Sequence, residues 1–378
     1  MPLDFRSSTS MTLGAEIELQ LIDPETKDLT PAAPSVLERL RPVTTKVKPE
    51  LFRSMLEIST DVCHDVRQVR ADLLESLMRV REVTDTMNVQ LACSGSHPFA
   101  RHSQRIIYPS ARYADLIDRN RWLARRFMVF GLHVHVGMRD GNHAIAMLNA
   151  MLQYQAHLLA LSASSPFWQG TDTGLASCRI TVYEALPTAG HPCTFDDWDS
   201  FSLAYQAMVE SRAIASIKDI WWDIRPHPDI GTVEVRVCDA PPTFTRLVAL
   251  VALVQSLFAW FDQRYRDGEP FPAPPYWVMR ENKWRASRWG LDADIVLDAS
   301  GRTANLKDEI FSLLERLAPL ARTLRCAEEL ASLGGDLEAS ASYRRQRQVA
   351  EETGSLPAVV SALAAELEAD TAMPAAPS

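Results

Sequence analysis

Three short stretches in which polar and apolar residues alternate constrain the fold of this chain more than any other feature of its sequence. In each stretch, aliphatic side chains separate residues that are mostly acidic, basic or imidazole-bearing. The polar sets are Glu16, Glu18 and Gln20, then His133 and His135, then Glu234 and Arg236. Because successive side chains of a β-strand point to opposite faces, the pattern predicts three strands, each with one polar face and one apolar face.

Alternation alone has a simpler explanation, because any antiparallel strand with one face in water shows it. Solvent-facing strand positions, however, usually hold Thr, Lys, Ser and Gln, whereas these three strands carry Glu, His, Arg and a single Gln. Glu and His are metal-binding groups, and Arg binds phosphates. We therefore favour a functional face over a solvated one.

Carboxylates that face one another across a sheet repel unless cations lie between them. Oxygen ligands joined by one or two imidazoles suit Mg²⁺ or Mn²⁺. The polar face therefore predicts divalent metal ions. Glu57, in the sequence SMLEIST, is a further candidate ligand because it interrupts an otherwise apolar short strand; simple exposure of that side chain is the alternative.

The chain contains neither a GxxxxGK[ST] loop nor a GxGxxG turn, the loops that cradle phosphates in many nucleotide-binding proteins. A phosphate donor would instead be held through metal ions, with arginine and lysine side chains completing the site. Arg236 is well placed for this role, because it lies on the same predicted strand face as Glu234.

Other basic residues have two readings each. Arg112 and Arg179 are candidate clamps for a substrate carboxylate and equally candidates for ordinary ion pairs. The segment ENKWRASRWG places Lys283, Arg285 and Arg288 among tryptophans. These residues could supply further cations to the site, but by itself the segment is more typical of a solvated amphipathic turn.

Helical periodicity alternates with short β-like runs along the chain, without a regular βαβ order. The predicted helices cover 66–87, 115–130, 143–163, 201–216, 243–265, 306–333 and 357–368. The predicted strands cover 12–21, 55–59, 91–94, 132–138, 180–185, 221–225 and 232–238. This order predicts an α+β fold with an antiparallel sheet and helices on one side, as a single domain over 1–370 with a disordered tail at 371–378.

Composition and charge narrow the class of protein. Hydrophobic residues make up 47% and charged residues 23% of the 378 residues, as in folded globular proteins. A net charge of −9 gives no general attraction to nucleic acid or anionic lipid. The apolar run at 247–261 is shorter than the roughly 20 residues of a membrane span, and the six scattered cysteines and the N-terminal sequence are typical of a cytoplasmic protein.

Five motifs together resemble one known family. The sequences LGAEIEL, GLHVHVG, LSASSPFWQGTDTG, DIRPHPDIGTVEVRVCDAP and ENKWRASRWG look like those of bacterial carboxylate-amine ligases related to glutamate-cysteine ligase. The resemblance covers roughly residues 11 to 365. It implies a glutamine synthetase-like fold, in which a curved antiparallel sheet holds metals, ATP and substrate on its concave face and helices pack on its outer side.

The resemblance also implies roles for individual residues. Glu16, Glu18, Glu57, His133 and Glu234 would be metal ligands. His135 and Arg236 would contact the nucleotide phosphates as catalytic groups, and Lys283 and Arg285 would support ATP or the acyl phosphate. The family's first motif commonly reads Glu-Glu-Glu, whereas the middle position here is Ile17, which alternation directs to the apolar face.

The reaction implied by the resemblance is ATP-dependent amide formation through an acyl phosphate, with Mg²⁺ or Mn²⁺ and with L-glutamate and L-cysteine as reference substrates. Two alternatives stay open: a metal-dependent hydrolase that activates water on the same face, and a nucleotide-binding regulator without turnover. The ligase would act on a small-molecule carboxylate and a small-molecule amine. A homodimer is compatible with the apolar helices.

Overall fold

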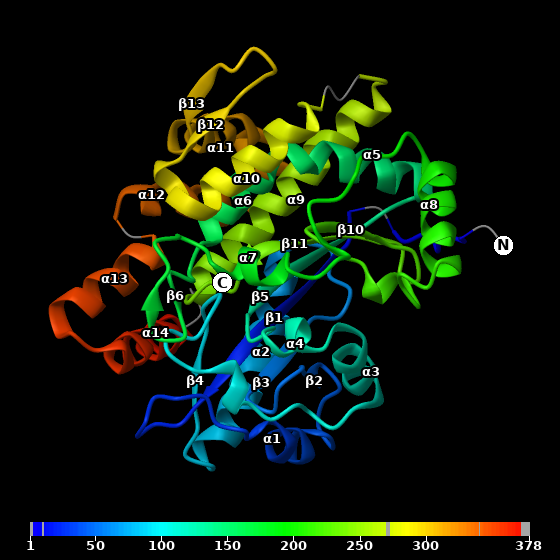
Figure 1. Cartoon of the computed structure of the whole chain (residues 1–378). Helices are drawn as coiled ribbons and strands as arrows, with labels where there is room; N and C mark the ends of the chain where they lie inside the picture. Colours follow the sequence, from blue (N-terminus) through cyan, green and yellow to red (C-terminus); the bar gives the residue numbers. More distant parts are fainter. Residues whose placement is uncertain (1–2, 10, 270–272, 340, 372–378) are drawn as a thin grey trace.

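The computed structural model describes residues 3–9, 11–269, 273–339 and 341–371, and a seven-stranded antiparallel sheet lies at its centre (Figure 1). The strands are β1 (Leu13–Ile22), β2 (Val47–Pro49), β3 (Met55–Ser59), β4 (Gln90–Ala92), β5 (Gly131–Gly137), β10 (Ile224–His227) and β11 (Thr232–Asp239). Their order is β10-β11-β5-β1-β3-β2, and β4 pairs with the last residues of β1. The predicted tail at 371–378 lies outside the described residues except for Thr371, which ends the last helix.

The three alternating stretches form the neighbouring strands β11, β5 and β1. In the register of these strands, Glu16 lies opposite His133, and His135 lies opposite Glu234. On the other side of β1, Glu18 lies opposite Glu57 of β3. The register therefore brings the polar residues of four strands onto one face of the sheet.

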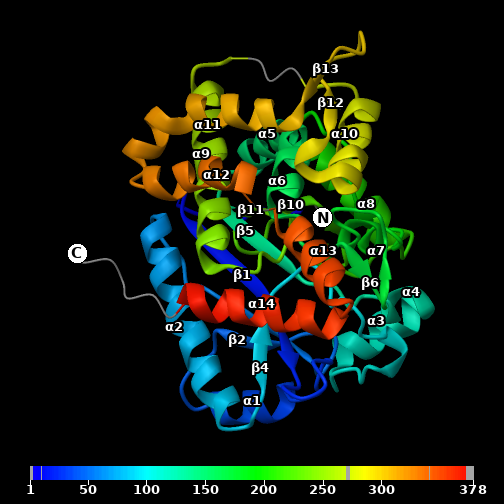
Figure 2. The same ribbon diagram turned by 90° about the vertical axis from the view of Figure 1, so that its left-hand side faces the viewer.

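Helices cover the apolar face of the sheet (Figure 2). Those that contact its strands include α2 (Val66–Asp85), α6 (Gln155–Ser162), α9 (Phe244–Arg266) and α14 (Leu356–Thr371). One continuous apolar core joins these helices to the strand residues that point away from the polar face. The predicted α+β fold is confirmed.

Helix α9 is the one described helix long and apolar enough to cross a membrane, but most of that apolar segment is buried inside the protein. Its Thr243 side chain caps the first turn by accepting a hydrogen bond from the Arg246 backbone. Apolar residues on all sides of a helix are typical of a buried core position. The helix therefore serves as the central support behind β5.

The remaining helices surround this core. They are α1 (Ala33–Leu40), α3 (Ala111–Asn120), α4 (Trp122–Arg125), α5 (Gly141–Met151), α7 (Arg179–Tyr183), α8 (Trp198–Glu210), α10 (Tyr276–Trp289), α11 (Leu306–Thr323), α12 (Ala327–Ala339) and α13 (Ser342–Thr353). Short 3₁₀ turns lie at His102–Gln104, Leu152–Tyr154, Ile217–Asp219 and Gly290–Asp292. Three two-stranded ribbons pair β6 (Phe167–Trp168) with β7 (Thr171–Asp172), β8 (Ala189–Gly190) with β9 (Trp221–Trp222), and β12 (Asp294–Val296) with β13 (Thr303–Asn305).

Two sequence predictions were wrong. The segment 180–185 was predicted as a strand but forms most of α7, in which Ile180, Val182 and Tyr183 are buried. Tertiary packing overrides β propensity here. The segment ENKWRASRWG is not a solvated turn but the second half of α10 and the residue after it.

Three predicted helices are divided in the structure. The helix expected over 143–163 is interrupted by the 3₁₀ turn at Leu152–Tyr154, which lies between α5 and α6. Arg121 separates α3 from α4, and Arg325 separates α11 from α12. Both residues have positive φ values, 49° and 59°, which continue no right-handed helix. Periodicity spans such a break without revealing it, because the apolar face resumes on the other side.

The two faces of β1 can be tested with neighbouring substitutions. Ile17→Ala removes a side chain that is 2% exposed and packs in the core, so we expect the free energy of unfolding to fall by about 3 kcal/mol. Glu18→Gln, one residue further on and on the polar face, should change it by less than about 1 kcal/mol, because an amide oxygen can still accept the Gly131 N–H bond. Urea denaturation measures both, and a larger loss in Glu18→Gln than in Ile17→Ala would contradict this assignment of faces.

Candidate active site

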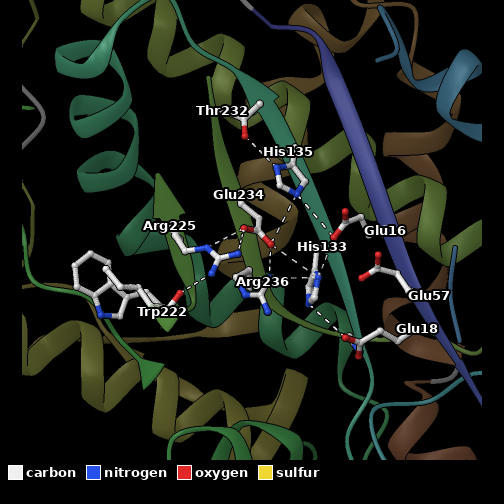
Figure 3. A network of polar contacts seen from close by, with 12 residues as sticks. Glu16, Glu18, Glu57, His133, His135, Trp222, Arg225, Thr232, Glu234 and Arg236 are labelled. Carbon is white, nitrogen blue, oxygen red and sulfur yellow. Dashed lines mark hydrogen bonds and ion pairs between the residues drawn. The ribbon is translucent and has the colours of Figure 1, made fainter. Parts of the chain in front are cut away.

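The polar face of the sheet lines a cavity of about 550 Å³. Strands β1, β3, β5 and β11 form its floor, and residues of α3 and of the segment 218–230 form its walls. Figure 3 shows carboxylates, imidazoles and guanidinium groups from different strands converging on this floor. The cavity therefore contains most of the residues that the sequence pattern singled out.

Two groups of ligand atoms on the floor have the arrangement that a metal ion requires. Glu16, Glu57 and His133 form one group, and Glu16, His135 and Glu234 form the other. Within each group, the atoms that would bind an ion lie within 4.8 Å of one another. Glu16 belongs to both groups, so the two positions are adjacent.

Burial raises the pKa of several carboxyl groups in the cavity. The pKa of Glu57 rises to about 8, with Glu16 and Glu50 adding to the effect of burial. The pKa of Glu18 rises to about 7 through burial and the nearby Glu57. Burial and the nearby Glu18 also raise the pKa of Glu50 to about 7. Full ionisation of such a cluster requires added positive charge, which a divalent cation supplies.

The two histidines offer imidazole nitrogens to the same space. Burial and the nearby Arg236 lower the pKa of His133 to about 4, so this ring is neutral at pH 7. Its Nε2 atom is buried and has no hydrogen-bond partner among the described residues. His135 pairs through Nδ1 with the Thr232 hydroxyl at 3.0 Å, which leaves Nε2 directed at Glu16 and Glu234. Although burial opposes it, the nearby Glu234 and Glu16 raise the pKa of His135. Neutral imidazole is a common metal ligand, and the His133 ring is already in that form.

Glu234 is held by two arginines. Arg225 donates to Oε2 of Glu234 through Nε at 2.9 Å and Nη2 at 2.6 Å, and Arg236 donates to Oε1. Although burial opposes ionisation, these guanidinium groups keep the pKa of Glu234 well below its usual range. Glu234 is 1% exposed, so it is part of a buried network of charged residues and is not in contact with bulk solvent.

An irregularity in β11 directs Arg236 into the cavity. The pairing of β11 with β5 shifts register between Val235 and Cys238, as at a β-bulge. The Arg236 backbone N–H donates to the Asp223 carbonyl at 2.7 Å. Arg179 donates to the Arg236 carbonyl at 3.3 and 3.2 Å. The backbone N–H and carbonyl groups of Arg236 are therefore both hydrogen-bonded to residues that do not belong to β5.

Arg179 depends on the absence of a side chain at Gly131. A Cβ atom at Gly131 would lie 2.2 Å from Nη2 of Arg179. Arg179 is 2% exposed and lines the cavity together with Arg112 of α3. Both predicted substrate-binding arginines therefore border the same space, although Arg179 also has a structural bond to Arg236.

Sequence reasoning missed several residues of the site. Lys48, Glu50, Arg225 and His227 line the cavity, and the Lys48 ammonium lies 3.3 Å from Glu57 and 3.7 Å from Glu16. Strand β2 is three residues long, too short for alternation to be recognised. His227 ends β10 within the sequence RPHPDIG, which is typical of a turn. Gln20, by contrast, does not line the cavity, because it is buried and donates to Ser94.

The structure does not bring Lys283 or Arg285 to the cavity. Lys283 is buried on the inner face of α10, and its ammonium group contacts Asp223 and Glu184. Arg285 donates to Glu281 at 2.7 Å and to the Asp294 carbonyl. Lys283 and Arg285 were expected to act together on ATP or the acyl phosphate. Two residues apart on a helix, however, they point in different directions from α10. Lys283 thus supports the site indirectly. It pairs with the Asp223 carboxylate, and the Asp223 carbonyl accepts the hydrogen bond from the Arg236 backbone N–H.

Comparison with known proteins gives a consistent result. A sequence model of the family described as "Glutamate-cysteine ligase family 2(GCS2)" matches residues 12–362. A Bdellovibrio bacteriovorus protein provisionally named glutamate–cysteine ligase 2 is 45% identical over 369 residues, covering 98% of each chain. A Thermobifida fusca protein with the same provisional name is 42% identical over 374 residues, covering 98% of this chain and 94% of the relative.

Solved structures show the same fold at low identity. The glutamate–cysteine ligase of Francisella tularensis in complex with AMP matches with a TM-score of 0.69 at 10% identity, covering 97% of this chain and 93% of the other. The bifunctional glutathione synthetase of Pasteurella multocida matches with a TM-score of 0.70 at 14% identity, covering 96% of this chain and 53% of the other. The glutamine synthetase-like fold expected from the sequence motifs is thereby confirmed.

The position of Lys283 predicts a structural effect of its removal. Lys283→Met leaves the buried Asp223 without its cation, so we expect the free energy of unfolding to fall by about 3–5 kcal/mol and to recover in part when Asp223→Asn is added. Arg285→Met removes a partly exposed pair of the same helix and should cost less than about 1 kcal/mol. Thermal or urea unfolding measures these differences. Equal stability of the two single variants would show that Lys283 does not have this supporting role.

Proposed function

The chain belongs to glutamate-cysteine ligase family 2, and on this premise we propose that it is an ATP-dependent carboxylate-amine ligase that joins L-glutamate to L-cysteine. The products would be γ-glutamylcysteine, ADP and phosphate. The observation that carries the proposal is the pair of ligand groups that share Glu16 and face one cavity with Arg236. Oxygen and imidazole ligands in this arrangement suit Mg²⁺ or Mn²⁺.

The residues present fit two such ions. Glu16, Glu57 and His133 would hold one and Glu16, His135 and Glu234 the other, with Glu18 beside His133 at 4.0 Å. The buried, unpartnered Nε2 of His133 supports this assignment. Divalent ions held by these residues would supply positive charge that neutralises the charge developing during phosphoryl transfer.

The proposed reaction has two steps. A carboxylate oxygen of glutamate attacks the γ-phosphorus of ATP, the bond to the β-phosphate oxygen breaks, and an acyl phosphate and ADP form. The cysteine amine then attacks the acyl carbon, phosphate leaves with the bonding electrons, and the new amide nitrogen loses a proton. No side chain acts as a nucleophile in this scheme, so the protein contributes by positioning and electrostatics.

The cavity contains cations suited to the anions of this reaction. Arg236 is fixed at the bulge and faces the metal-ligand groups, so we assign its guanidinium to the phosphates of ATP. The His135 ring, which the family resemblance assigned to these phosphates, belongs instead to the second metal-ligand group in this proposal. Arg112 and Arg179 border the same cavity, and we assign them to the substrate carboxylates, because a guanidinium group forms two parallel hydrogen bonds with a carboxylate. Lys48, whose ammonium lies 3.7 Å from Glu16 and 3.3 Å from Glu57, adds a half-exposed positive charge to the cavity.

The rest of the chain is compatible with this activity. All six cysteines lie in the described part of the chain and are free thiols, as in a reducing compartment. We propose a cytoplasmic enzyme whose residues 1–370 form a single catalytic domain acting on small molecules.

The proposal predicts nucleotide turnover that requires both substrates. With Mg²⁺ and ATP, we expect ADP and phosphate only when a carboxylate and an amine are present together, and mass spectrometry should detect the condensed amide. L-Glutamate with L-cysteine is the first pair to test, followed by other carboxylates and amines. Metal-dependent hydrolysis of a substrate that needs no ATP and releases no ADP would favour a hydrolase. Tight ATP binding without ADP release under any pair would favour a regulator.

Glu16 provides the sharpest test of the site, because it belongs to both ligand groups. Glu16→Gln should reduce turnover by at least about 100-fold and weaken Mn²⁺ binding measured by electron paramagnetic resonance, and EDTA should abolish activity of the wild type. Glu75→Gln, an exposed residue of α2 paired with Arg79, is the matched control. Wild-type turnover or wild-type Mn²⁺ affinity in Glu16→Gln would contradict the assignment.

A further inference from the structure

The motif LSASSPFWQGTDTG, residues 161–174, contains serines that are buried outside the active-site cavity. Ser162, Ser164 and Ser165 are at most 2% exposed, and none of the residues described at 161–174 lines that cavity. Buried polar groups are normally hydrogen-bonded. The Ser164 backbone and the Ser165 hydroxyl donate to one carboxylate, that of Asp239 at the end of β11. The motif is therefore organised around a buried carboxylate.

Asp239 is fully buried and is held by three donors. Its Oδ2 atom accepts the Ser164 backbone N–H at 2.9 Å and the Ser165 hydroxyl at 2.7 Å, and Oδ1 accepts the Ser177 hydroxyl at 2.8 Å. Gly95 leaves room for this carboxylate, because a Cβ atom at Gly95 would lie 2.5 Å from it. Hydrogen bonds are directional, so donors on both oxygens fix the orientation of the carboxylate.

The same carboxylate holds the start of α7, whose first residue is Arg179. The Ser165 hydroxyl oxygen accepts the Arg179 backbone N–H at 3.1 Å. Ser177, which donates directly to Asp239, lies two residues before Arg179. Burial raises the pKa of Asp239, and the nearby positive charge of Arg179 opposes that rise. Asp239 thus holds the chain directly at Ser177 and through Ser165 at Arg179.

These contacts close a ring between two arginines that line the cavity. Asp239 follows Arg236 by three residues in β11. Arg179 donates from Nη1 and Nη2 to the Arg236 carbonyl at 3.3 and 3.2 Å. We refer to Arg236, Asp239, Ser165 and Arg179 as the Asp239 ring. Because each member is joined to the next through β11 or through a hydrogen bond, the ring sets the position of Arg179 relative to Arg236.

The Arg179 guanidinium group has donors available for a ligand. A guanidinium group carries five N–H donors, and the two hydrogen bonds that this one donates to described residues end on a single carbonyl oxygen. Its Nε atom is buried without a hydrogen-bond partner in the described part of the chain. A Cβ atom at Gly131 would lie 2.2 Å from Nη2 of Arg179 and 3.1 Å from Nε2 of His133. The guanidinium therefore lies beside a proposed metal ligand, where a substrate carboxylate could pair with it.

We propose that Asp239 and Ser165 are positioning residues, which hold Arg179 relative to Arg236 so that the substrate carboxylate is aligned with the γ-phosphate of ATP. The inference rests on the proposed function, in which Arg179 binds the carboxylate and Arg236 binds the phosphates. Reacting atoms must lie about 3–3.5 Å apart, and a displacement of about 1 Å can lower the rate about 100-fold. The alternative is a ring that only stabilises the fold.

Removal of the Ser165 hydroxyl separates Arg179 from Asp239 with a small change in volume. In Ser165→Ala and in Asp239→Asn, we expect the KM for L-glutamate to rise at least about tenfold and kcat to fall. The Kd for ADP with Mg²⁺ should not change, because the Arg236 backbone N–H is held separately by Asp223. A ring that only stabilises the fold would reduce the amount of active enzyme, which lowers the apparent kcat but leaves KM unchanged.

Asp262→Asn is the matched control for loss of a buried charge. Asp262 is a 5% exposed residue of α9 that pairs with Arg139 and Arg266, and it does not line the active-site cavity. This variant should unfold at a lower urea concentration than the wild type, while its KM for L-glutamate stays at the wild-type value. An increase in KM equal to that of Asp239→Asn would show that loss of stability alone produces the effect.

A double variant tests whether Ser165 acts through Arg179. Arg179→Ala removes the guanidinium group that the ring positions. Adding Ser165→Ala to Arg179→Ala should therefore lower kcat/KM no further, although Ser165→Ala alone lowers it at least about tenfold. If the two substitutions act independently, their effects on kcat/KM will multiply, and the positioning role will be excluded.

Calorimetric titration with L-glutamate, in the presence of Mg²⁺ and ADP, separates this inference from the proposed function. Binding that is at least about tenfold weaker in Ser165→Ala than in the wild type, without turnover in either, would support the positioning role and contradict the ligase. Unchanged KM and Kd for L-glutamate in both Ser165→Ala and Asp239→Asn would overturn the inference. A wild type that binds no L-glutamate would overturn it as well.

Discussion

The register of β5 between β1 and β11 is the constraint on which the site depends. In that register Glu16 lies opposite His133, and His135 lies opposite Glu234. Side chains directly opposite one another in antiparallel strands have Cβ atoms about 5 Å apart, close enough for their ends to share one ion. A slip of one residue would turn every one of these groups into the apolar core, so the core on the far side of the sheet enforces the geometry of the site.

Buried charge pairs give the floor of the cavity its rigidity. Arg225 and Arg236 surround Glu234, and Lys283 neutralises Asp223, whose carbonyl in turn holds the Arg236 backbone. Breaking one partner of such a pair leaves an uncompensated charge in a medium that solvates it poorly. Arg236, which lines the cavity, is therefore held in place by Asp223, and Lys283 neutralises the Asp223 carboxylate behind it.

Much of the site could be predicted from the sequence because it lies on long, regular strands. Ten residues of alternating β1 and eight of β11 expose their pattern directly, and Glu57 stands out in an apolar run. Other strands are too short to show alternation. Lys48 lies in β2, which spans three residues, and Glu50 follows that strand directly. Arg225 lies in β10, which is four residues long and contains a proline. Helix α7 was misread because local β-branched composition says nothing about the core into which those residues pack.

The sequence by itself determined the family, the α+β class and which residues of the central strands share a polar face, because strand periodicity is a local property of the backbone. Only the tertiary structure decided what each polar residue meets. Glu18 and Glu57 become neighbours through a strand pairing that spans some forty residues of chain. Lys283 proved to lie beneath the cavity and Arg179 beside Gly131, since contacts between distant segments, and not the residue types, set whether a cation faces substrate or a buried carboxylate.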